Sequence, residues 1–225
     1  MISPTQRKKR STQQRENENS IANGFCADAR CNYFGGRTPA KSEDTTRKLS
    51  HVDVIYDSVT APHGERLRTI VTKPHDAKGK KLPVIFVAGW LSGDSVEAPA
   101  GTKDATGVVF QGLAQLPDFC LFRVDKHGVG DSEGVCGETD FESELAGYRA
   151  AFAALKRYDF IDADRVYILG ISNGGGFAPL VPNSDAEQAK VRGYISVGGW
   201  TKTWFEHMLE IERRRFALMG KSPGR

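Results

Sequence analysis

Residues 165–176 constrain the fold of this chain more than any other part of its sequence. They begin with a short apolar run, 166–169, which is typical of a strand buried on both faces of a sheet. The run leads directly into Gly170-Ile171-Ser172-Asn173-Gly174, which matches the pattern G-x-S-x-G. Glycines at both ends allow a strand to reverse into a helix around the central residue. The pattern therefore predicts a strained turn that exposes the Ser172 hydroxyl and leaves the Asn173 N–H free to hold an oxyanion.

A five-residue pattern arises often by chance, so the alternative is a glycine-rich turn with an incidental serine. The surrounding elements favour the nucleophile turn. Continuous apolar runs predict strands at residues 83–88, 119–124, 166–169 and 194–197. Helical spacing of apolar side chains predicts helices at 106–116 and 141–158, with a capping box between Thr139 and Glu142 at the start of the second. Strands that alternate with helices predict an α/β fold with a mostly parallel, doubly wound sheet.

The N-terminal part of the chain follows a different pattern. Segments 51–60 and 66–73 alternate apolar and polar residues around Ala61-Pro62-His63-Gly64, which predicts an antiparallel hairpin at the sheet edge. Residues 1–48 are polar and lack apolar periodicity, so they cannot bury enough surface to offset the entropy lost on ordering. We therefore expect a disordered leader over 1–48 and one α/β domain over 49–225.

The leader also carries the positive charge. The chain has a formal net charge of +3, whereas residues 1–48 contain ten Lys and Arg against five acids, a net charge of +5. Arg7-Lys8-Lys9-Arg10 would fit a nucleic-acid or import patch, but a solvated leader is the simpler explanation, and we expect no nucleic-acid partner. No apolar run approaches the ~20 residues that span a bilayer, and no signal peptide is visible. We expect a cytoplasmic protein with no membrane partner.

Neither a metal nor a cofactor is expected from the sequence. Cys26 and Cys31 are too far apart for a C-x-x-C motif and have no histidine cluster nearby, and Cys120 lies in an apolar run as a buried, inert thiol would. The segment Gly128-Val129-Gly130 superficially suggests a phosphate-binding loop. However, two carboxylates follow it in place of a helix start, and they would repel a pyrophosphate.

A family resemblance emerges around this glycine segment. Asp125-Lys126-His127-Gly128-Val129-Gly130-Asp131-Ser132 resembles the Asp/Arg-x-x-Gly-x-Gly-x-Ser turn of the α/β-hydrolase superfamily. The resemblance continues through Asp140-Phe141 and Gly147-Tyr148-Arg149 to the G-x-S-x-G stretch and Ala178-Pro179-Leu180. It covers about residues 50–220 and is most similar to bacterial dienelactone-hydrolase and serine-aminopeptidase-like branches. In that family the glycine turn is structural, which implies that Asp125, His127 and Asp131 are not the catalytic acid and base.

The resemblance implies a serine hydrolase that acts on carboxylic esters. Ser172 would attack the carbonyl carbon, and the backbone N–H of Asn173 would hold the oxyanion. In this family the second donor lies in the loop after the first buried strand, here Ala88-Gly89-Trp90-Leu91-Ser92-Gly93, where its position belongs to the Trp90 N–H. The alternative for this loop is a glycine-rich turn with Trp90 over the sheet edge, and the two are compatible.

The family order places an acid and then a histidine after the serine. Beyond Ser172 the only histidine is His207, in an amphipathic helical pattern that indicates a surface or packing residue. Asp185, before the last predicted strand, is not well placed as the acid. We therefore expect the chain to be truncated before the acid, the histidine and the last strands of the fold. Three aromatic residues in this region suit an apolar acyl pocket: Trp200, Trp204 and Phe205.

Two other functions are compatible with the sequence. One is a serine peptidase or acyltransferase on the same fold, and the other is a non-catalytic remnant that binds a partner. The enzyme would act on a small-molecule ester or amide without a cofactor. The remnant would bind a complementary C-terminal fragment or a second copy, because an unpaired sheet edge exposes apolar surface. Without a base in reach of Ser172, we expect at best a poor esterase.

Overall fold

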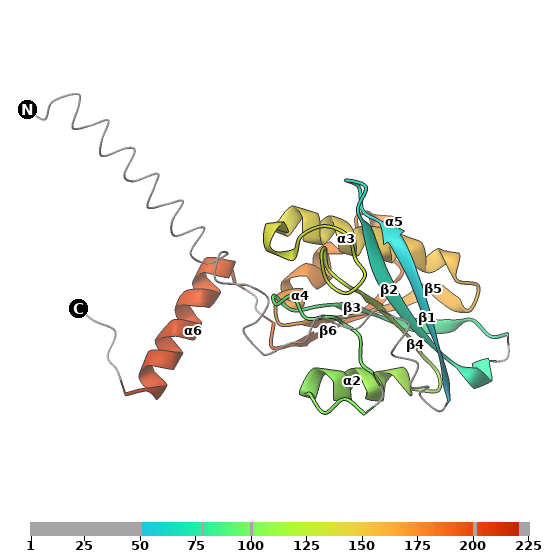
Figure 1. Ribbon diagram of the computed structural model, residues 1–225, viewed down its shortest axis with the longest axis horizontal. Helices are drawn as coiled ribbons and strands as arrows, with labels where there is room; N and C mark the ends of the chain where they lie inside the picture. Colours follow the sequence, from blue (N-terminus) through green and yellow to red (C-terminus); the bar gives the residue numbers. More distant parts are fainter. Residues whose placement is uncertain (1–50, 78, 100, 200–201, 221–225) are drawn as a thin grey trace, which may run out of the picture.

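A six-stranded sheet organises the part of the chain that the computed structural model describes, residues 51–77, 79–99, 101–199 and 202–220 (Figure 1). The leader predicted over residues 1–48 lies outside this part. The strand order is β1-β2-β4-β3-β5-β6. The strands are β1 Val52–Thr60, β2 Arg66–Pro74, β3 Leu82–Ala88, β4 Cys120–Val124, β5 Ile161–Ile171 and β6 Val191–Val197. The helices are α2 Ala105–Ala114, α3 Phe141–Ala153, α4 Asn173–Phe177, α5 Asp185–Gln188 and α6 Trp204–Leu218.

The strand directions confirm the predicted fold class. β4, β3, β5 and β6 run parallel to one another, whereas β2 is antiparallel to both β1 and β4. The alternating segments thus form a hairpin at the sheet edge, and the continuous apolar runs form the parallel strands. Every residue of β3 and of β4 is buried, which requires cover on both faces of the sheet.

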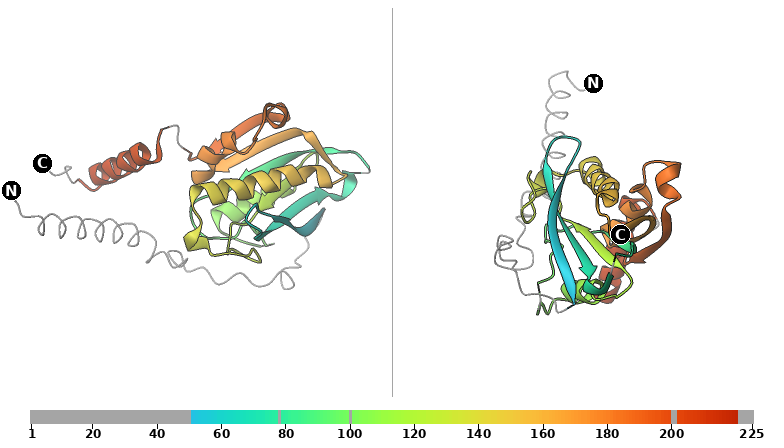
Figure 2. Two further views of the ribbon diagram at one scale, coloured as in Figure 1. Left: turned by 90° about the horizontal axis from the view of Figure 1, so that it is seen from above. Right: turned by 90° about the vertical axis from the view of Figure 1, so that its right-hand side faces the viewer.

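Helices α2 and α3 supply this cover from opposite sides (Figures 1 and 2). Phe110 of α2 belongs to a buried cluster with Ile85 and Val87 of β3. Phe152 of α3 packs on the other face against Phe86, with ring centroids 5.7 Å apart. Successive β3 side chains therefore face opposite helices, as the two-residue period of a strand requires.

The start and the end of α3 differ from the predicted ones. Asp140 caps the helix in place of Thr139, because the Asp140 carboxylate accepts a 2.8 Å hydrogen bond from the Ser143 N–H. The segment predicted as one helix ends as a 3-10 turn over Ala154–Arg157. Both Thr139 and Asp140 suit a cap, so the pattern alone could not choose between them.

The last two strands are longer than their apolar runs predict. β5 begins at Ile161 and β6 at Val191. The predicted runs are shorter because polar residues interrupt the apolar pattern in the first part of each strand. Among the described strands, β6 pairs only with β5. Its Tyr194, Ile195 and Val197 side chains are 42%, 45% and 54% exposed. β6 is therefore an edge strand with uncovered apolar side chains on both faces.

Helix α6 follows β6 and stands apart from the sheet (Figure 1; Figure 2, left). A reciprocal capping box between Thr203 and Glu206 starts it. Phe205, in its first turn, is 70% exposed. None of the helices in the described ranges has the length and apolar character needed to cross a bilayer.

Candidate active site

Ser172 lies at the junction between β5 and α4, where the glycine spacing predicts it. Its φ of 53° and ψ of −115° are far from any regular structure, and no other non-glycine residue of the described part has a positive φ. Such a conformation costs about 1–3 kcal/mol and persists only where the surroundings impose it. Here the Ser172 N–H donates to the Val197 carbonyl at 2.8 Å, and the Ser172 carbonyl accepts from the Gly175 N–H at 3.0 Å. A strained serine held by its neighbours in this way is typical of a functional turn.

The two motif glycines are required by close approach. A Cβ at Gly170 would lie 2.4 Å from the Gly174 carbonyl oxygen. A Cβ at Gly174 would lie 2.0 Å from the Ala88 carbonyl oxygen and 2.4 Å from that of Gly89. The turn therefore packs directly on the end of β3, which brings Ser172 and Asn173 beside the loop that carries Trp90.

A pocket of about 530 Å³ opens beside this turn. Asn173 borders it, and Leu91 of the neighbouring loop contributes to its wall. Phe141 and Phe177 form the rest of the apolar wall, with ring centroids 4.7 Å apart and planes at 17°. Glu144 is one of the two carboxylates on its border. The pocket has the size of a site for a small organic molecule.

Of the three aromatic side chains predicted for an acyl pocket, the described part of the chain includes only that of Phe205. Phe205 lies on α6, away from the sheet, and is not part of the pocket wall. Trp200 and the side chain of Trp204 lie outside the described residues. Phe141, the first residue of the predicted helix, is 50% exposed because it faces the pocket. A half-exposed phenylalanine at a helix start carries no sequence signal that separates it from the core stripe.

A buried polar network lies behind the loop that follows β3. The Tyr148 hydroxyl of α3 accepts a 2.9 Å hydrogen bond from the Gly89 N–H and donates to the Glu144 carboxylate at 3.0 Å. The Lys126 ammonium forms a 3.0 Å ion pair with the same Glu144 oxygen and donates to the Trp90 carbonyl. Burial, together with the Glu144 charge, raises the pKa of Tyr148 well above its usual value. The phenol therefore remains protonated and keeps its donor role.

The glycine turn after β4 serves the structure of this edge. The Asp125 carboxylate is buried, accepts a 2.6 Å hydrogen bond from the Arg68 guanidinium and a 2.8 Å bond from the Val96 N–H. Gly130 has a φ of 57°, and a Cβ there would lie 2.3 Å from the same guanidinium. His127 is buried, with its Cβ 3.2 Å from the position of a Cβ at Gly134. These contacts support the structural role that the resemblance implies for Asp125 and His127.

A catalytic base for Ser172 is not apparent in the described part of the chain. The described part of the chain includes all five histidines. None of them forms a hydrogen bond there with the Ser172 side chain. His207 lies on α6, and Asp185 begins α5. In the same ranges no group of three or more His, Cys, Asp or Glu side chains could hold a metal ion. Cys120 is fully buried, and burial raises the pKa of its thiol to about 12.

Sequence comparison finds no protein-family model and no curated protein that matches the chain. Solved structures do match. A hypothetical protein from Pseudomonas aeruginosa is 18% identical with a TM-score of 0.57, over 83% of this chain and 61% of that protein. The α/β hydrolase GrgF from Penicillium sp. sh18 is 16% identical with a TM-score of 0.52, over 76% and 57% of the two chains. A Pyrococcus furiosus esterase is 14% identical with a TM-score of 0.51, over 73% and 55%. The chain thus spans less than two thirds of each of these proteins.

Proposed function

From the α/β-hydrolase fold that this chain shares with those structures, we propose that it is a serine hydrolase acting on carboxylic esters. The observation that carries the proposal is the strained Ser172, with its φ of 53°, at a strand-to-helix turn packed on the loop after β3. Backbone strain of this kind is concentrated at functional sites, and here it has no evident use in folding. The esterase named among the similar structures is in keeping with this chemistry.

In the proposed reaction Ser172 Oγ attacks the ester carbonyl carbon and loses its proton to a base. The carbonyl oxygen becomes an oxyanion that the N–H groups of Trp90 and Asn173 stabilise. The alcohol leaves, and water then hydrolyses the acyl group from Ser172. One oxyanion donor is worth about 2.7–4 kcal/mol of transition-state stabilisation. The apolar pocket between Leu91, Phe141 and Phe177 would take the hydrocarbon group of the substrate.

The site needs a base that the described residues do not place at Ser172. A serine hydroxyl is a weak nucleophile at neutral pH without one. We therefore expect turnover by the purified chain to be slow, although the oxyanion donors and the pocket retain roughly 10³–10⁴-fold acceleration over water when a triad is incomplete. A peptidase or acyltransferase would use the same residues, and only a comparison of ester and peptide substrates separates these activities.

A non-catalytic protein that binds a partner is the second candidate. It is favoured by the uncovered apolar side chains of β6 and by the position of α6 apart from the sheet. In that case the partner would be a complementary fragment or a second copy that covers this surface.

The test is to measure p-nitrophenyl butyrate hydrolysis and fluorophosphonate labelling of the purified chain beside its Ser172→Ala variant. We expect slow turnover and a covalent mass increase on the peptide that contains Ser172, both lost in the variant. Ser184→Ala is the matched control, because it removes a serine hydroxyl that caps α5. Turnover and labelling that survive in Ser172→Ala would refute the nucleophile. An unlabelled wild-type chain that associates with a partner would favour the second candidate.

A further inference from the structure

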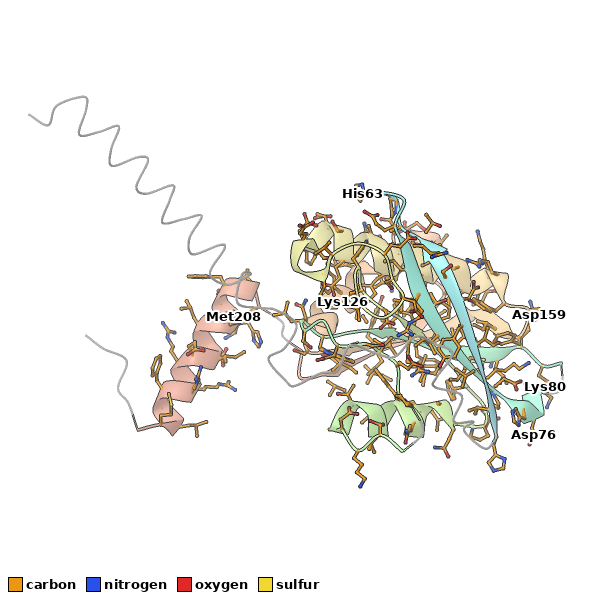
Figure 3. All side chains as sticks on the ribbon, viewed as in Figure 1. His63, Asp76, Lys80, Lys126, Asp159 and Met208 are labelled. Carbon is orange, nitrogen blue, oxygen red and sulfur yellow. The ribbon has the colours of Figure 1, made fainter. Side chains whose placement is uncertain are left out.

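The loop that carries Trp90 is held from behind by two side chains of distant elements. The Tyr148 hydroxyl accepts the Gly89 N–H at 2.9 Å, and the Lys126 ammonium donates to the Trp90 carbonyl. Figure 3 shows Lys126 at the end of the sheet where α4 begins, opposite Asp76, Lys80 and Asp159. The network therefore lies at the same end of the molecule as Ser172.

The two hydrogen bonds hold the two peptide groups that flank the peptide group containing the Trp90 N–H. The peptide group before it supplies the Gly89 N–H, and the peptide group after it supplies the Trp90 carbonyl. Gly89 has no side chain that could restrict its rotation, so these bonds restrict it instead. With both neighbouring peptide groups held, the backbone on either side of the Trp90 N–H is fixed in place, which narrows the range of orientations that this N–H can adopt.

Glu144 joins the two contacts into one unit. Its carboxylate accepts from Tyr148 and forms an ion pair with Lys126, both at 3.0 Å. The Lys126 and Glu144 side chains are only 9% and 10% exposed, so water compensates little for the loss of either partner. Glu144 also borders the pocket, and its pairing with Lys126 prevents an uncompensated charge beside a bound substrate.

We propose that Tyr148, together with the Lys126–Glu144 pair, is a positioning group that orients the Trp90 N–H for oxyanion binding. The inference rests on the proposed function, because it assigns these residues to the same oxyanion site. It adds that the donor geometry depends on α3 and on Lys126 in the turn after β4, and not on the Trp90 loop alone. Tyr148 acts through the Gly89 backbone and does not touch the substrate.

The probe is phenylboronic acid, whose boron becomes tetrahedral and negatively charged when Ser172 Oγ adds to it and the hydroxyl proton is released. The adduct resembles the tetrahedral intermediate, so its affinity reports on the oxyanion donors. Boron-11 NMR separates the tetrahedral adduct from the trigonal free acid. Ethylbenzene, an uncharged molecule of similar shape, reports on the pocket alone.

Tyr148→Phe removes the hydroxyl and keeps the ring. We expect it to weaken phenylboronic acid binding by about 10- to 100-fold. This effect is at most about as large as that of removing a whole oxyanion donor. Ethylbenzene binding should stay unchanged. Tyr158→Phe is the matched control: it also removes a buried tyrosine hydroxyl, one that donates to Asp57 at 2.8 Å. The control should change neither affinity.

A second variant keeps the test decisive if Tyr148→Phe folds poorly. Lys126→Met combined with Glu144→Gln removes both charges together and leaves no unpaired ion. Because Glu144 borders the pocket, this double variant should weaken phenylboronic acid binding by a larger factor than it changes ethylbenzene binding. Equal phenylboronic acid affinity in wild type and in both variants would overturn the positioning role and leave the proposed function intact. A wild-type chain without a tetrahedral adduct, or one whose adduct persists in Ser172→Ala, would overturn the proposed function and this inference with it.

Discussion

Gly174→Ala probes how rigidly the Ser172 turn is joined to the end of β3. The added Cβ would lie 2.0 Å from the Ala88 carbonyl oxygen and 2.4 Å from that of Gly89. Carbon–oxygen contacts are rarely shorter than about 3.3 Å, so β3 or α4 must move by roughly 1 Å. Overpacking of this kind costs about 1–3 kcal/mol of unfolding free energy. For a domain of this size, that lowers the Tm by about 2–12 °C.

The same movement should impair the site. A displacement of about 1 Å among groups that position a reaction can cost about 100-fold in rate. We therefore expect Gly174→Ala to slow fluorophosphonate labelling of Ser172 and to weaken phenylboronic acid binding by a similar factor. Thermal unfolding followed by circular dichroism measures the stability, and mass spectrometry over time measures the labelling rate.

Gly112→Ala is the control for this experiment. Gly112 lies in α2, and a Cβ there would have no heavy atom within 4 Å. Alanine in a helix interior is favoured over glycine by about 0.5–1 kcal/mol, so this variant should be slightly more stable and label at the wild-type rate. A Gly174→Ala protein with the wild-type Tm and labelling rate would refute the close contact between the turn and β3.

Three further outcomes are expected. Ser172→Gly should unfold at a higher temperature than Ser172→Ala, because glycine adopts a positive φ without the strain of a Cβ; the reverse order would contradict the strain. Asp140→Ala should lower the Tm at neutral pH, because hydrogen bonds from Ser143 lower the pKa of Asp140 and its ionised form stabilises α3. That difference from wild type should shrink as the pH falls below about 4, and a constant difference would argue against the cap. Burial raises the pKa of Cys120 to about 12, so iodoacetamide should leave it unmodified in the folded protein and react in denaturant, as peptide mass spectrometry will show.

The local parts of the fold could be predicted from the sequence because their causes are local. The turn at Ser172 follows from its flanking glycines, of which Gly170 meets the backbone of Gly174 within the same turn. The buried strands β3 and β4 follow from apolar runs, since each is buried at every position. The hairpin follows from alternation on either side of a short turn.

The parts that the sequence did not predict depend on contacts between distant residues. Tyr148 lies in the helix predicted over 141–158, and its hydroxyl accepts from the Gly89 N–H, 59 residues away in the chain. Phe141 starts the same predicted helix but faces the pocket. The first part of β5 was missed because Asp162 and Arg165 break its pattern, although Ile161 pairs with Leu82.

The unpaired edge of β6 should govern the tendency of the protein to self-associate in solution. Tyr194, Ile195 and Val197 present apolar area to water on both sides of a strand that pairs with only one described neighbour. Repulsion between molecules is weakest near the isoelectric point, which the sequence places at ≈ 8.6. Attraction between apolar surfaces grows with warming and with excluded salts such as sulfate. The protein should therefore remain dispersed best in cool buffers of low salt and a pH well below that point. Light scattering should rise on warming, on addition of sulfate, or as the pH approaches the isoelectric point.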